Sequence, residues 1–458
     1  MKTDTIAAIA TAMAPSGIGI IRLSGEESFL IMDQIFRSKR EQKKLSEQQT
    51  HTIHYGYIYD GEDLIDEVMV LLMRAPHSYT KEDTIEIDCH GGVFVMKKIL
   101  ETVIKYGARP ADPGEFTKRA FLNGRIDLSQ AESVIDVIHS QNSFALKSSL
   151  QQLKGSVKKE IVNIREIILH EIAFIESALD DPEHISLEGY PQQLLSIVKE
   201  QVSKIQKLIA SSDNGRMLSE GIKTVIVGKP NAGKSSLLNC MMRENRAIVT
   251  DVAGTTRDVL EERLNLNGVS LTILDTAGIR ETTDIVEKIG VERAKENIED
   301  ADLILYVVDA SVSLDESDYE IMKFIQEKKV IVLLNKSDLE TKTTLEDVSS
   351  HLLAEYITFS AKTEFGLEEL ENKIIDLFFE GNVTFNNEVY ITNIRHKNAL
   401  MNAEQSLSLV IQSICDEMPE DLFSIDLLNA YESLGLIIGE SVEDDLVNEI
   451  FSKFCMGK

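Results

Sequence analysis

The eight residues Gly228-Lys-Pro-Asn-Ala-Gly-Lys-Ser235 decide the fold of one large part of this chain. They fit the pattern G-x-x-x-x-G-K-[S/T], and they follow the apolar, β-branched run Ile222 to Val227. A strand, a glycine-rich turn and a helix that starts near Lys234 are therefore predicted. In such a turn the backbone N–H groups face inward and bind phosphates. Lys234 would reach the outer phosphates, and Ser235 would bind Mg²⁺.

Four further segments follow in order: Asp251-Val-Ala-Gly-Thr-Thr-Arg-Asp258, Asp275-Thr-Ala-Gly278, Asn335-Lys-Ser-Asp338 and Ser360-Ala-Lys362. The last three each follow an apolar run, which places them at strand ends. An aspartate at a strand end followed by a glycine suits metal binding through water and sensing of the γ-phosphate. The Asp338 carboxylate can accept hydrogen bonds from the N1–H and 2-amino groups of guanine. Adenine lacks both donors, so this residue would select the base.

Each segment alone could be an ordinary β–α turn, but the ordered set predicts a guanine-nucleotide-binding domain. A parallel-type α/β sheet of the Ras-like class is therefore expected, with GTP as the substrate. The predicted GTP-binding residues are Asn231, Ala232, Gly233, Lys234, Ser235, Ser236, Thr250, Asp251, Val252, Ala253, Gly254, Thr255, Thr256, Asp275, Thr276, Ala277, Gly278, Asn335, Lys336, Asp338, Ser360, Ala361 and Lys362.

The residue after Asp275-Thr-Ala-Gly278 is Ile279, where many small GTPases have a glutamine that orients the attacking water. An aliphatic side chain cannot orient water, so another polar group must do so. Arg257 is either an arginine finger or an ordinary loop charge, and the residues alone leave both open. The polar candidates nearer to Ile279 are Arg280, Glu281, Asp284 and Glu287.

The GTPase motifs and both ends of the chain resemble the MnmE (TrmE) family of tRNA-modification GTPases. The motifs are Gly-x-Pro-Asn-Ala-Gly-Lys-Ser, the loop from Thr250 to Asp258, and the aliphatic residue after Asp-Thr-Ala-Gly. The segment from Pro113 to Leu128, continuing into Gln130-Ala-Glu132, resembles the family's signature between its first two domains. The ending Cys455-Met-Gly-Lys458 resembles its C-terminal Cys-Ile/Leu-Gly-Lys. The resemblance covers essentially the whole chain.

The resemblance implies a mechanism in which K⁺ replaces the arginine finger when two GTPase domains dimerise. An arginine finger elsewhere is worth about 10³–10⁵ in rate. Glu287 corresponds to the family's water-orienting acid, although without the resemblance it reads as a solvated residue on a charged helix. The implied K⁺ ligands are Asn231, Thr250, Val252 and Thr255, and those of Mg²⁺ are Ser235 and Thr256.

The resemblance also implies that the N-terminal domain binds a tetrahydrofolate and forms a homodimer. The family's folate positions fall on Arg22, Glu86, Arg125 and Lys458. The family usually has lysine where Arg125 stands; the charge is kept, but a planar guanidinium and an ammonium are not interchangeable in every geometry. Arg22 and Glu86 also lie in expected strands, so a structural role is the alternative.

Cys455 lies three residues from the end of the sequence and is the second predicted catalytic residue. Lys458 would lower its pKa if the two side chains meet. The alternative is a tail thiol without a role. Met456 departs from the family's usual aliphatic residue but has a similar volume.

The implied function is GTP hydrolysis coupled to tRNA modification. With the FAD-dependent partner MnmG, in a heterotetramer, the family adds an aminomethyl or carboxymethylaminomethyl group to C5 of the wobble uridine (position 34) of certain tRNAs. The carbon comes from 5,10-methylenetetrahydrofolate, with 5-formyltetrahydrofolate as the other candidate ligand. A ribosome-assembly GTPase of the Era/EngA kind is one alternative, but the sequence shows no KH-like domain with a G-x-x-G loop after the GTPase motifs. A signalling scaffold is another, and it leaves the folate positions unused.

Composition limits the partners and the location. The chain has 458 residues, and 47 basic against 76 acidic side chains give a net charge of −29. Such a surface repels nucleic acid on average, so RNA contact needs a local basic patch or a partner protein. Four cysteines without C-x-x-C spacing indicate reduced thiols in a cytoplasmic protein. The apolar stretch Ile6 to Ala14 is interpreted as part of a strand region and not as a signal peptide, and no run is long enough to cross a membrane.

Three domains are predicted: an N-terminal α+β folate-binding and dimerisation domain (1–118), a discontinuous helical domain (119–215 and 381–458), and an inserted GTPase domain (216–380). In the first, strands are expected at Ile18–Leu23, His54–Tyr59, Glu67–Met73 and Thr84–Cys89, and a helix at Gly92–Tyr106. Isoleucines from Ile161 to Ile175 recur at helical spacing, and Asp180-Asp181-Pro182 should end that helix. Pro191 marks another break, Ser211-Ser-Asp-Asn-Gly215 is interpreted as a linker, and helices are expected at 396–415, 421–435 and 440–454.

Overall fold

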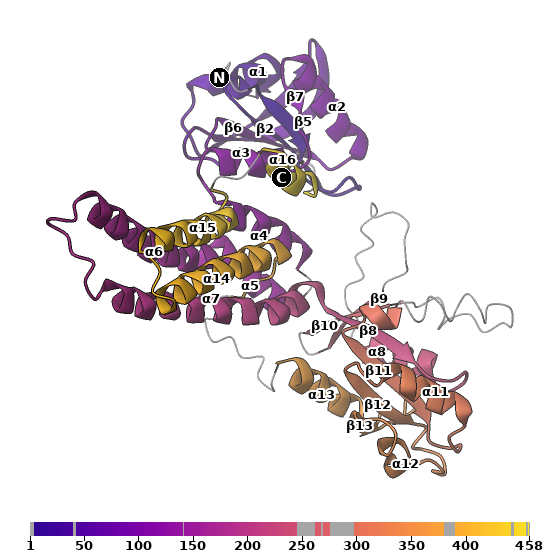
Figure 1. Ribbon diagram of the computed structural model, residues 1–458. Coiled ribbons are helices and arrows are strands. Elements are labelled where there is room, and N and C mark those ends of the chain that lie inside the picture. Colours follow the sequence, from indigo (N-terminus) through magenta and orange to yellow (C-terminus); the bar gives the residue numbers. More distant parts are fainter. Residues whose placement is uncertain are drawn as a thin grey trace. The chain divides into compact units, whose positions relative to one another are not determined.

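A computed structural model shows how the chain folds, and it describes residues 4–39, 43–140, 142–244, 262–266, 269–274, 297–379, 390–440, 444–454 and 457 (Figure 1). The chain divides into two compact units. The first contains residues 1–135, 152–191 and 413–458, and the second contains residues 136–151 and 192–412. The division into three domains with boundaries near residues 118, 215 and 380 stays a prediction.

The first unit is built on a seven-stranded sheet in the order β3-β4-β5-β6-β2-β1-β7. Neighbouring strands are antiparallel, except for the parallel pair β1 and β7. The four strands and the helix predicted here are confirmed to within a few residues at their ends. The elements are β1 (Ile6–Ile9), β2 (Ile18–Ser24), α1 (Ser28–Ile35), β3 (Phe36–Ser38), the short 3₁₀ helix Leu45–Glu47, β4 (Thr52–Asp60), β5 (Asp63–Met73), β6 (Thr84–His90), α2 (Val93–Lys105) and β7 (Arg109–Pro110).

Helices α1 and α2 cover one face of this sheet. Alternate strand residues such as Ile21, Leu23 and Ile87 point into the core that these helices close. Because successive side chains of a strand point to opposite faces, Arg22 and Glu86 lie on the other face. The sheet therefore places these two predicted folate positions on neighbouring strands and on the same face.

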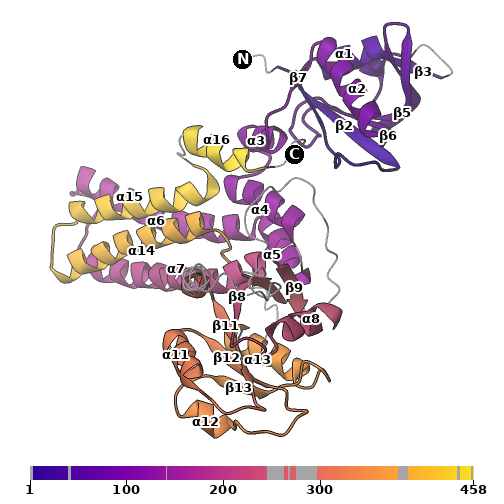
Figure 2. The ribbon, with the colours of Figure 1, turned by 90° about the vertical axis from the view of Figure 1, so that its right-hand side faces the viewer.

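The helices α3 (Glu115–Leu122), α6 (Ser156–Asp180), α15 (Asp421–Ile438) and α16 (Asp444–Ser452) belong to the first unit. Other helices cross its boundary, among them α4 (Leu128–His139) and α5 (Ser143–Leu153). The isoleucine face of α6 packs on α15, and α6 ends at Asp180 as predicted. α16 lies beside α3 in both views (Figures 1 and 2). Gly114, at φ +68°, precedes α3, and a Cβ there would lie 2.5 Å from the Phe451 carbonyl oxygen.

The second unit contains a six-stranded sheet in the order β13-β12-β11-β8-β10-β9. The strands are parallel except for β9, which pairs with β10 in the antiparallel sense at one edge. Continuous apolar runs such as β11 suit strands that are buried on both faces. The elements are β8 (Ile222–Val227), α8 (Lys234–Glu244), β9 (Glu262–Leu266), β10 (Val269–Ile273), β11 (Leu303–Asp309), α11 (Glu316–Ile325), β12 (Val330–Asn335), α12 (Leu345–Ser349), β13 (Glu355–Thr358) and α13 (Leu367–Phe379).

Helices pack on both faces of this sheet. α8 and α13 supply apolar side chains to the core on one face, and α11 and α12 supply those on the other. The predicted fold class is therefore confirmed: an α+β N-terminal part, a set of long helices, and a doubly wound, mainly parallel α/β part.

The linker predicted at 211–215 is wrong, because these residues lie inside α7 (Tyr190–Glu220). The hydroxyls of Ser211 and Ser212 donate to carbonyls of the preceding helical turn at 2.7 and 2.6 Å. At Gly215 a Cβ would lie 2.3 Å from the Ile391 carbonyl oxygen, so the glycine permits a close approach of the chain just before α14 (Ile394–Cys415). Serine and glycine serve contacts within the fold here and do not mark a flexible connection.

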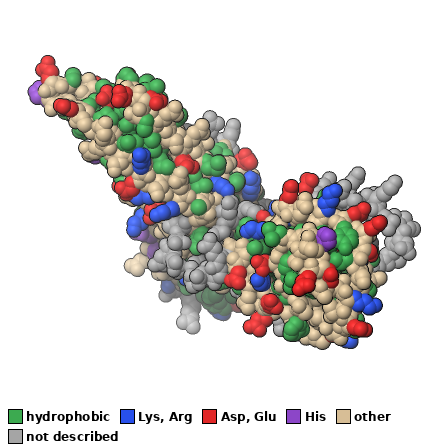
Figure 3. Space-filling view, turned by 60° about the horizontal axis from the view of Figure 1, so that its bottom comes forward, with side chains coloured by type: hydrophobic (Ala, Val, Ile, Leu, Met, Phe, Trp, Pro, Cys, Tyr) green, Lys and Arg blue, Asp and Glu red, His purple; other side chains and the backbone are tan. Residues whose placement is uncertain are grey.

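Among the residues that the structure describes, no helix is long and apolar enough to cross a membrane. Cys89 and Cys240 are buried, and Cys415 is exposed. On the face drawn in Figure 3, acidic side chains are scattered among apolar and neutral ones.

Candidate functional site

The glycine-rich turn after β8 has the shape that its sequence predicts. Gly228 has φ +149°, and a Cβ there would lie 2.3 Å from the Val307 carbonyl oxygen on β11. Gly233 has φ +106°, and its Cβ would lie 2.1 Å from Nδ2 of Asn335. Both positions therefore require glycine, for the backbone conformation and for the close neighbour. α8 begins at Lys234, as expected.

Lys234 lies across this turn. Its Nζ donates to the carbonyl oxygens of Gly228 at 2.7 Å and Lys229 at 2.9 Å. Burial lowers the pKa of Lys234. Asn231, the first predicted K⁺ ligand, has φ +63° and is exposed. The lysine charge and the N–H groups at the start of α8 together form a site for an anion such as a phosphate group.

Asn335 connects the glycine-rich turn with the segment Ser360-Ala-Lys362. It is the last residue of β12 and only 2% exposed. Its Nδ2 donates to the Ala232 carbonyl oxygen at 2.8 Å, and its Oδ1 accepts from the Ala361 N–H at 3.0 Å. One side chain thus holds three predicted segments at the carboxyl ends of β8, β12 and β13, and this is the sheet edge at which ligands bind in parallel α/β sheets.

The base-reading segments also contact each other. The Ser360 hydroxyl donates to Oδ1 of Asp338 at 2.8 Å, and this orients an exposed carboxylate. Lys336 has φ +65°, and its Nζ lies 2.5 Å from Oδ2 of Asp309 at the end of β11. Burial would raise the pKa of Asp309, but the hydrogen bonds from Lys336 and Ser311 lower it overall.

Lys229 and its partners are functional candidates that the sequence did not reveal. Lys229 Nζ lies 2.8 Å from Oδ2 of Asp315 and 2.5 Å from Oδ2 of Asp318, which is 2% exposed. Asp315 is the N-cap of α11, and the two aspartates form its capping box. Burial opposes the charge of Lys229, but these hydrogen bonds raise its pKa overall. The capping pattern D-x-x-D was visible in the sequence, whereas its lysine partner was not.

Two predicted folate positions form an ion pair on the open face of the first sheet. Arg22 on β2 stands opposite Glu86 on β6, and its Nε donates to Oε1 of Glu86 at 2.7 Å. Nη1 of Arg22 donates to the Gly457 carbonyl oxygen at 3.1 Å. Gly457 has φ +85°, and a Cβ there would lie 2.4 Å from the Ile9 carbonyl oxygen. Gly457 therefore lies against β1, beside Arg22.

Tyr79, which the sequence did not single out, connects Arg22 with Arg125. The guanidinium carbon of Arg125 lies 4.6 Å from the ring centroid of Tyr79, and that of Arg22 lies 5.7 Å from it. The Tyr79 hydroxyl shares a hydrogen bond of 2.9 Å with Thr117 on α3. Three of the four predicted folate positions are therefore described: Arg22 and Arg125 lie over the Tyr79 ring, and Glu86 is paired with Arg22.

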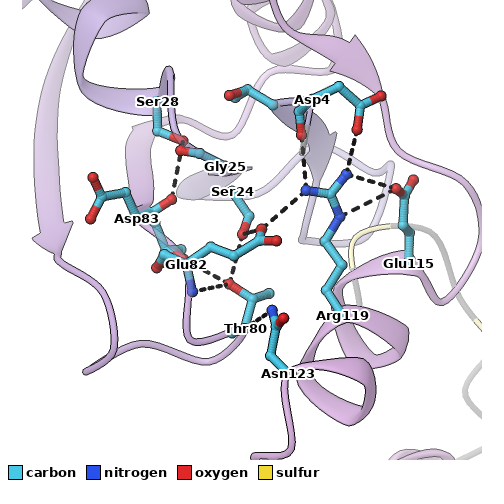
Figure 4. Close-up of polar contacts among 12 residues, drawn as sticks. Asp4, Ser24, Gly25, Ser28, Thr80, Glu82, Asp83, Glu115, Arg119 and Asn123 are labelled. Carbon is cyan, nitrogen blue, oxygen red and sulfur yellow. Dashed lines mark hydrogen bonds and ion pairs between the residues drawn. The ribbon is translucent and has the colours of Figure 1, made fainter. Parts of the chain in front are cut away.

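An ionic network fixes the surroundings of this ring (Figure 4). Arg119 on α3 pairs with Glu115 at 3.0 Å, Glu82 at 3.0 Å and Asp4 at 2.9 Å. Burial would raise the pKa of Glu115, but hydrogen bonds from Arg109, the Asp112 N–H and Arg119 lower it overall. Burial opposes the charge of Arg119, but its carboxylate partners raise its pKa.

Of the other predicted site residues, Lys362, Ser235 and Ser236 are described and exposed. The rest lie outside the described residues, so the structure does not place them. The predicted residues without a described position are Thr250, Asp251, Val252, Ala253, Gly254, Thr255, Thr256, Asp275, Thr276, Ala277, Gly278, Glu287, Cys455 and Lys458, together with the alternatives Arg257, Arg280, Glu281 and Asp284.

Comparisons with known proteins cover the whole chain. The profile of the MnmE helical domain matches residues 128–455, and that of the GTP-binding protein TrmE N-terminus matches residues 5–125. The tRNA modification GTPase MnmE of Lachnoclostridium phytofermentans is 59% identical over 458 residues, which is 100% of both chains. The protein of the same name from Thermoanaerobacter pseudethanolicus is 47% identical over 100% of both chains.

Solved structures resemble only part of the chain. Aquifex aeolicus Era bound to GDP·AlF4⁻ is 32% identical, and the match covers 41% of this chain and 67% of that one with a TM-score of 0.27. The G domain of the T. maritima FeoB iron transporter is 28% identical, and the match covers 34% of this chain and 97% of that one with a TM-score of 0.26.

Proposed function

Because this chain belongs to the MnmE family of tRNA modification GTPases, we propose that it hydrolyses GTP to drive the modification of tRNA wobble uridines. With an FAD-dependent MnmG partner it adds an aminomethyl or carboxymethylaminomethyl group to C5 of that uridine. The one-carbon donor is 5,10-methylenetetrahydrofolate, or 5-formyltetrahydrofolate as its stable counterpart. The chain works in the cytoplasm as a homodimer that joins MnmG in a heterotetramer.

The observation that carries the GTPase part is the meeting of three segments through Asn335. The glycine-rich turn, the segment ending at Asp338 and the segment starting at Ser360 come together at the carboxyl edge of the sheet. The turn supplies phosphate-binding N–H groups and Lys234, and Asp338 supplies the acceptor for guanine. This donor and acceptor set fits a guanine nucleotide and does not fit an adenine nucleotide at the base.

The chain's own residues divide the work of hydrolysis. Lys234 binds the outer phosphates, and the Ser235 hydroxyl at the start of α8 is a suitable oxygen ligand for Mg²⁺, with Thr256 as the second. Asn231, Thr250, Val252 and Thr255 would hold K⁺ through oxygen atoms. These cations supply positive charge where negative charge develops between the β- and γ-phosphates. Glu287 accepts a hydrogen bond from the attacking water and orients it.

The one-carbon site is assigned to the open face of the first sheet. A carboxylate such as Glu86 can accept hydrogen bonds from the N–H and amino groups of a pterin. Arg22 pairs with Glu86 at 2.7 Å, and Arg125 and Lys458 provide cations for the glutamate part of the folate. Cys455 stands two positions before Gly457 in the sequence, and the Gly457 carbonyl oxygen accepts a hydrogen bond from Arg22.

The GTPase proposal is tested with Glu287→Ala. This variant should bind a fluorescent GTP analogue with wild-type affinity, while its rate of GTP hydrolysis falls by about 10² or more. Glu320→Ala, which changes an exposed glutamate on α11, is the matched control and should hydrolyse GTP normally. Near-normal hydrolysis by Glu287→Ala would rule out the water-orienting role. Exchanging K⁺ for Na⁺ should slow turnover strongly; indifference to the ion would favour Arg257.

The tRNA proposal is tested by mass spectrometry of nucleosides from cells that lack the chain. C5-modified wobble uridines should disappear and should return with the full chain. They should not return with a chain that lacks residues 455–458. Unchanged nucleosides would refute the tRNA role and leave GTP hydrolysis to be judged separately.

A further inference from the structure

Tyr79 is the aromatic residue around which the predicted one-carbon site is arranged. Its ring lies within contact distance of two guanidinium groups, one from β2 and one from the segment after α3. The side chain is half-buried and packs against the apolar cluster that contains Phe116. A tyrosine in this position offers the face of its ring to a cation while its edge remains in the core.

The loop that carries Tyr79 is held firmly on both sides. The next residue, Thr80, is fully buried, and its hydroxyl lies 2.7 Å from that of Ser24 on β2. Asn123 Nδ2 donates to the Thr80 carbonyl oxygen at 2.7 Å (Figure 4). Lys81 Nζ donates to the carbonyl oxygens of Asn123 and Gly124, at 3.1 and 3.0 Å. These hydrogen bonds hold the loop that contains Tyr79 against the residues immediately before Arg125. The Tyr79 ring and the Arg125 guanidinium are therefore held in place relative to each other.

Arg22 and Arg125 differ in how many of their guanidinium nitrogens already have a partner among the described residues. Arg22 uses three of its nitrogens, Nε and Nη2 on Glu86 and Nη1 on the Gly457 carbonyl oxygen. Within the described part of the chain, the contact with Tyr79 is the only interaction recorded for the Arg125 guanidinium. Arg125 is also exposed. Its five N–H donors are therefore available to an anionic ligand.

We propose that Tyr79 is a positioning residue, whose ring holds the Arg125 guanidinium in place to bind a carboxylate of the reduced folate. The inference rests on the proposed one-carbon function. It adds Tyr79 to the site and assigns different roles to Arg22 and Arg125. Arg22 holds the Glu86 carboxylate in place, whereas Arg125 binds the ligand. A guanidinium that is already held by an aromatic ring loses less side-chain freedom on binding, which increases affinity.

The inference is tested by calorimetric titration of the full-length chain with 5-formyltetrahydrofolate. Tyr79→Leu removes the ring and should weaken binding about tenfold, whereas Tyr79→Phe keeps the ring and should bind within about threefold of wild type. Tyr59→Leu is the matched control, because Tyr59 on β4 makes the same kind of contact with Arg37 at 4.1 Å and is separated from β2 by two strands. Its affinity should equal that of wild type.

A structural role for Tyr79 is separated from a positioning role by combining variants. Arg125→Met should weaken binding roughly tenfold or more, and adding Tyr79→Leu to it should cost little further affinity, because the ring acts through the arginine. Equal losses from Tyr79→Leu in both backgrounds would refute the inference, as would wild-type affinity of Tyr79→Leu alone. If the wild-type chain does not bind 5-formyltetrahydrofolate, the proposed one-carbon function falls and the inference falls with it.

Discussion

Removing the side chain of Asn335 should loosen the nucleotide site without touching any residue that contacts the phosphates. In Asn335→Ala the buried carbonyl oxygen of Ala232 loses its donor, and the N–H of Ala361 loses its acceptor. Because Asn335 is only 2% exposed, water cannot readily replace either partner. The turn after β8 and the segment after β13 would then lose the side chain that joins them.

The magnitude follows from the two groups left without partners. An unsatisfied buried polar group costs about 1–3 kcal/mol, so two of them destabilise this unit by roughly 2–6 kcal/mol. For a domain of this size, each kcal/mol lowers the midpoint of thermal unfolding by about 2–4 °C. The unfolding transition of this unit should therefore fall by at least about 4 °C and by up to about 24 °C.

Scanning calorimetry with and without GDP provides the assay, because the transition that shifts with GDP belongs to the nucleotide-binding unit. Asn372→Ala is the matched control, since Asn372 is an exposed asparagine on α13 in the same unit. It should change the transition by no more than about 2 °C. If Asn335→Ala unfolds within 2 °C of wild type and binds GDP equally well, the reasoning about the Asn335 bridge is wrong.

Three other outcomes are expected. Asp338→Asn should weaken GDP binding and favour xanthosine diphosphate, because the amide can donate to the C2 carbonyl of xanthine; unchanged preference in competition titrations would contradict the base assignment. Gly233→Ala should abolish nucleotide binding in a filter assay, since its Cβ would lie 2.1 Å from Asn335 Nδ2 at φ +106°, and retained binding would contradict this packing. The lowered pKa of Glu115 stabilises the fold above its usual value of 4.5, and this stabilisation is lost as the pH falls through the lower folded value. Acid unfolding of Arg119→Met should therefore depend less on pH below about 4.5, and an unchanged slope would refute the contribution of the network.

The structural elements that were predicted from the sequence are those whose sequence pattern consists of residues close together in the chain. The turn from Gly228 to Ser235 is one uninterrupted pattern between an apolar run and a helix, and the structure reproduces both flanking elements. The strands of the first unit were predicted from short apolar runs for the same reason. Asp338 and Ser360 were both predicted to bind GTP, and a hydrogen bond joins their side chains.

The parts missed from sequence depend on neighbours that are distant along the chain. The ion pairs of Lys229 exist only because α11 places Asp315 and Asp318 beside it in the fold. Tyr79 lies in an irregular loop, and nothing near it in the sequence indicates that two arginines will meet its ring. The segment from 211 to 215 was misread because serine, asparagine and glycine are common in loops, while here Gly215 gives room to Ile391.

The contact between Arg22 and Gly457 joins positions that are 435 residues apart. At a synthesis rate of about 5–20 residues per second, roughly 20 to 90 s separate the two ends as they leave the ribosome. The first sheet can fold well before the tail exists, because its strands are contiguous in the early part of the chain. Arg22 can therefore pair with Glu86 long before the Gly457 carbonyl oxygen is available to it. A chain that stops before Gly457 would keep the strands of this sheet and lack the contact that Gly457 makes with Arg22.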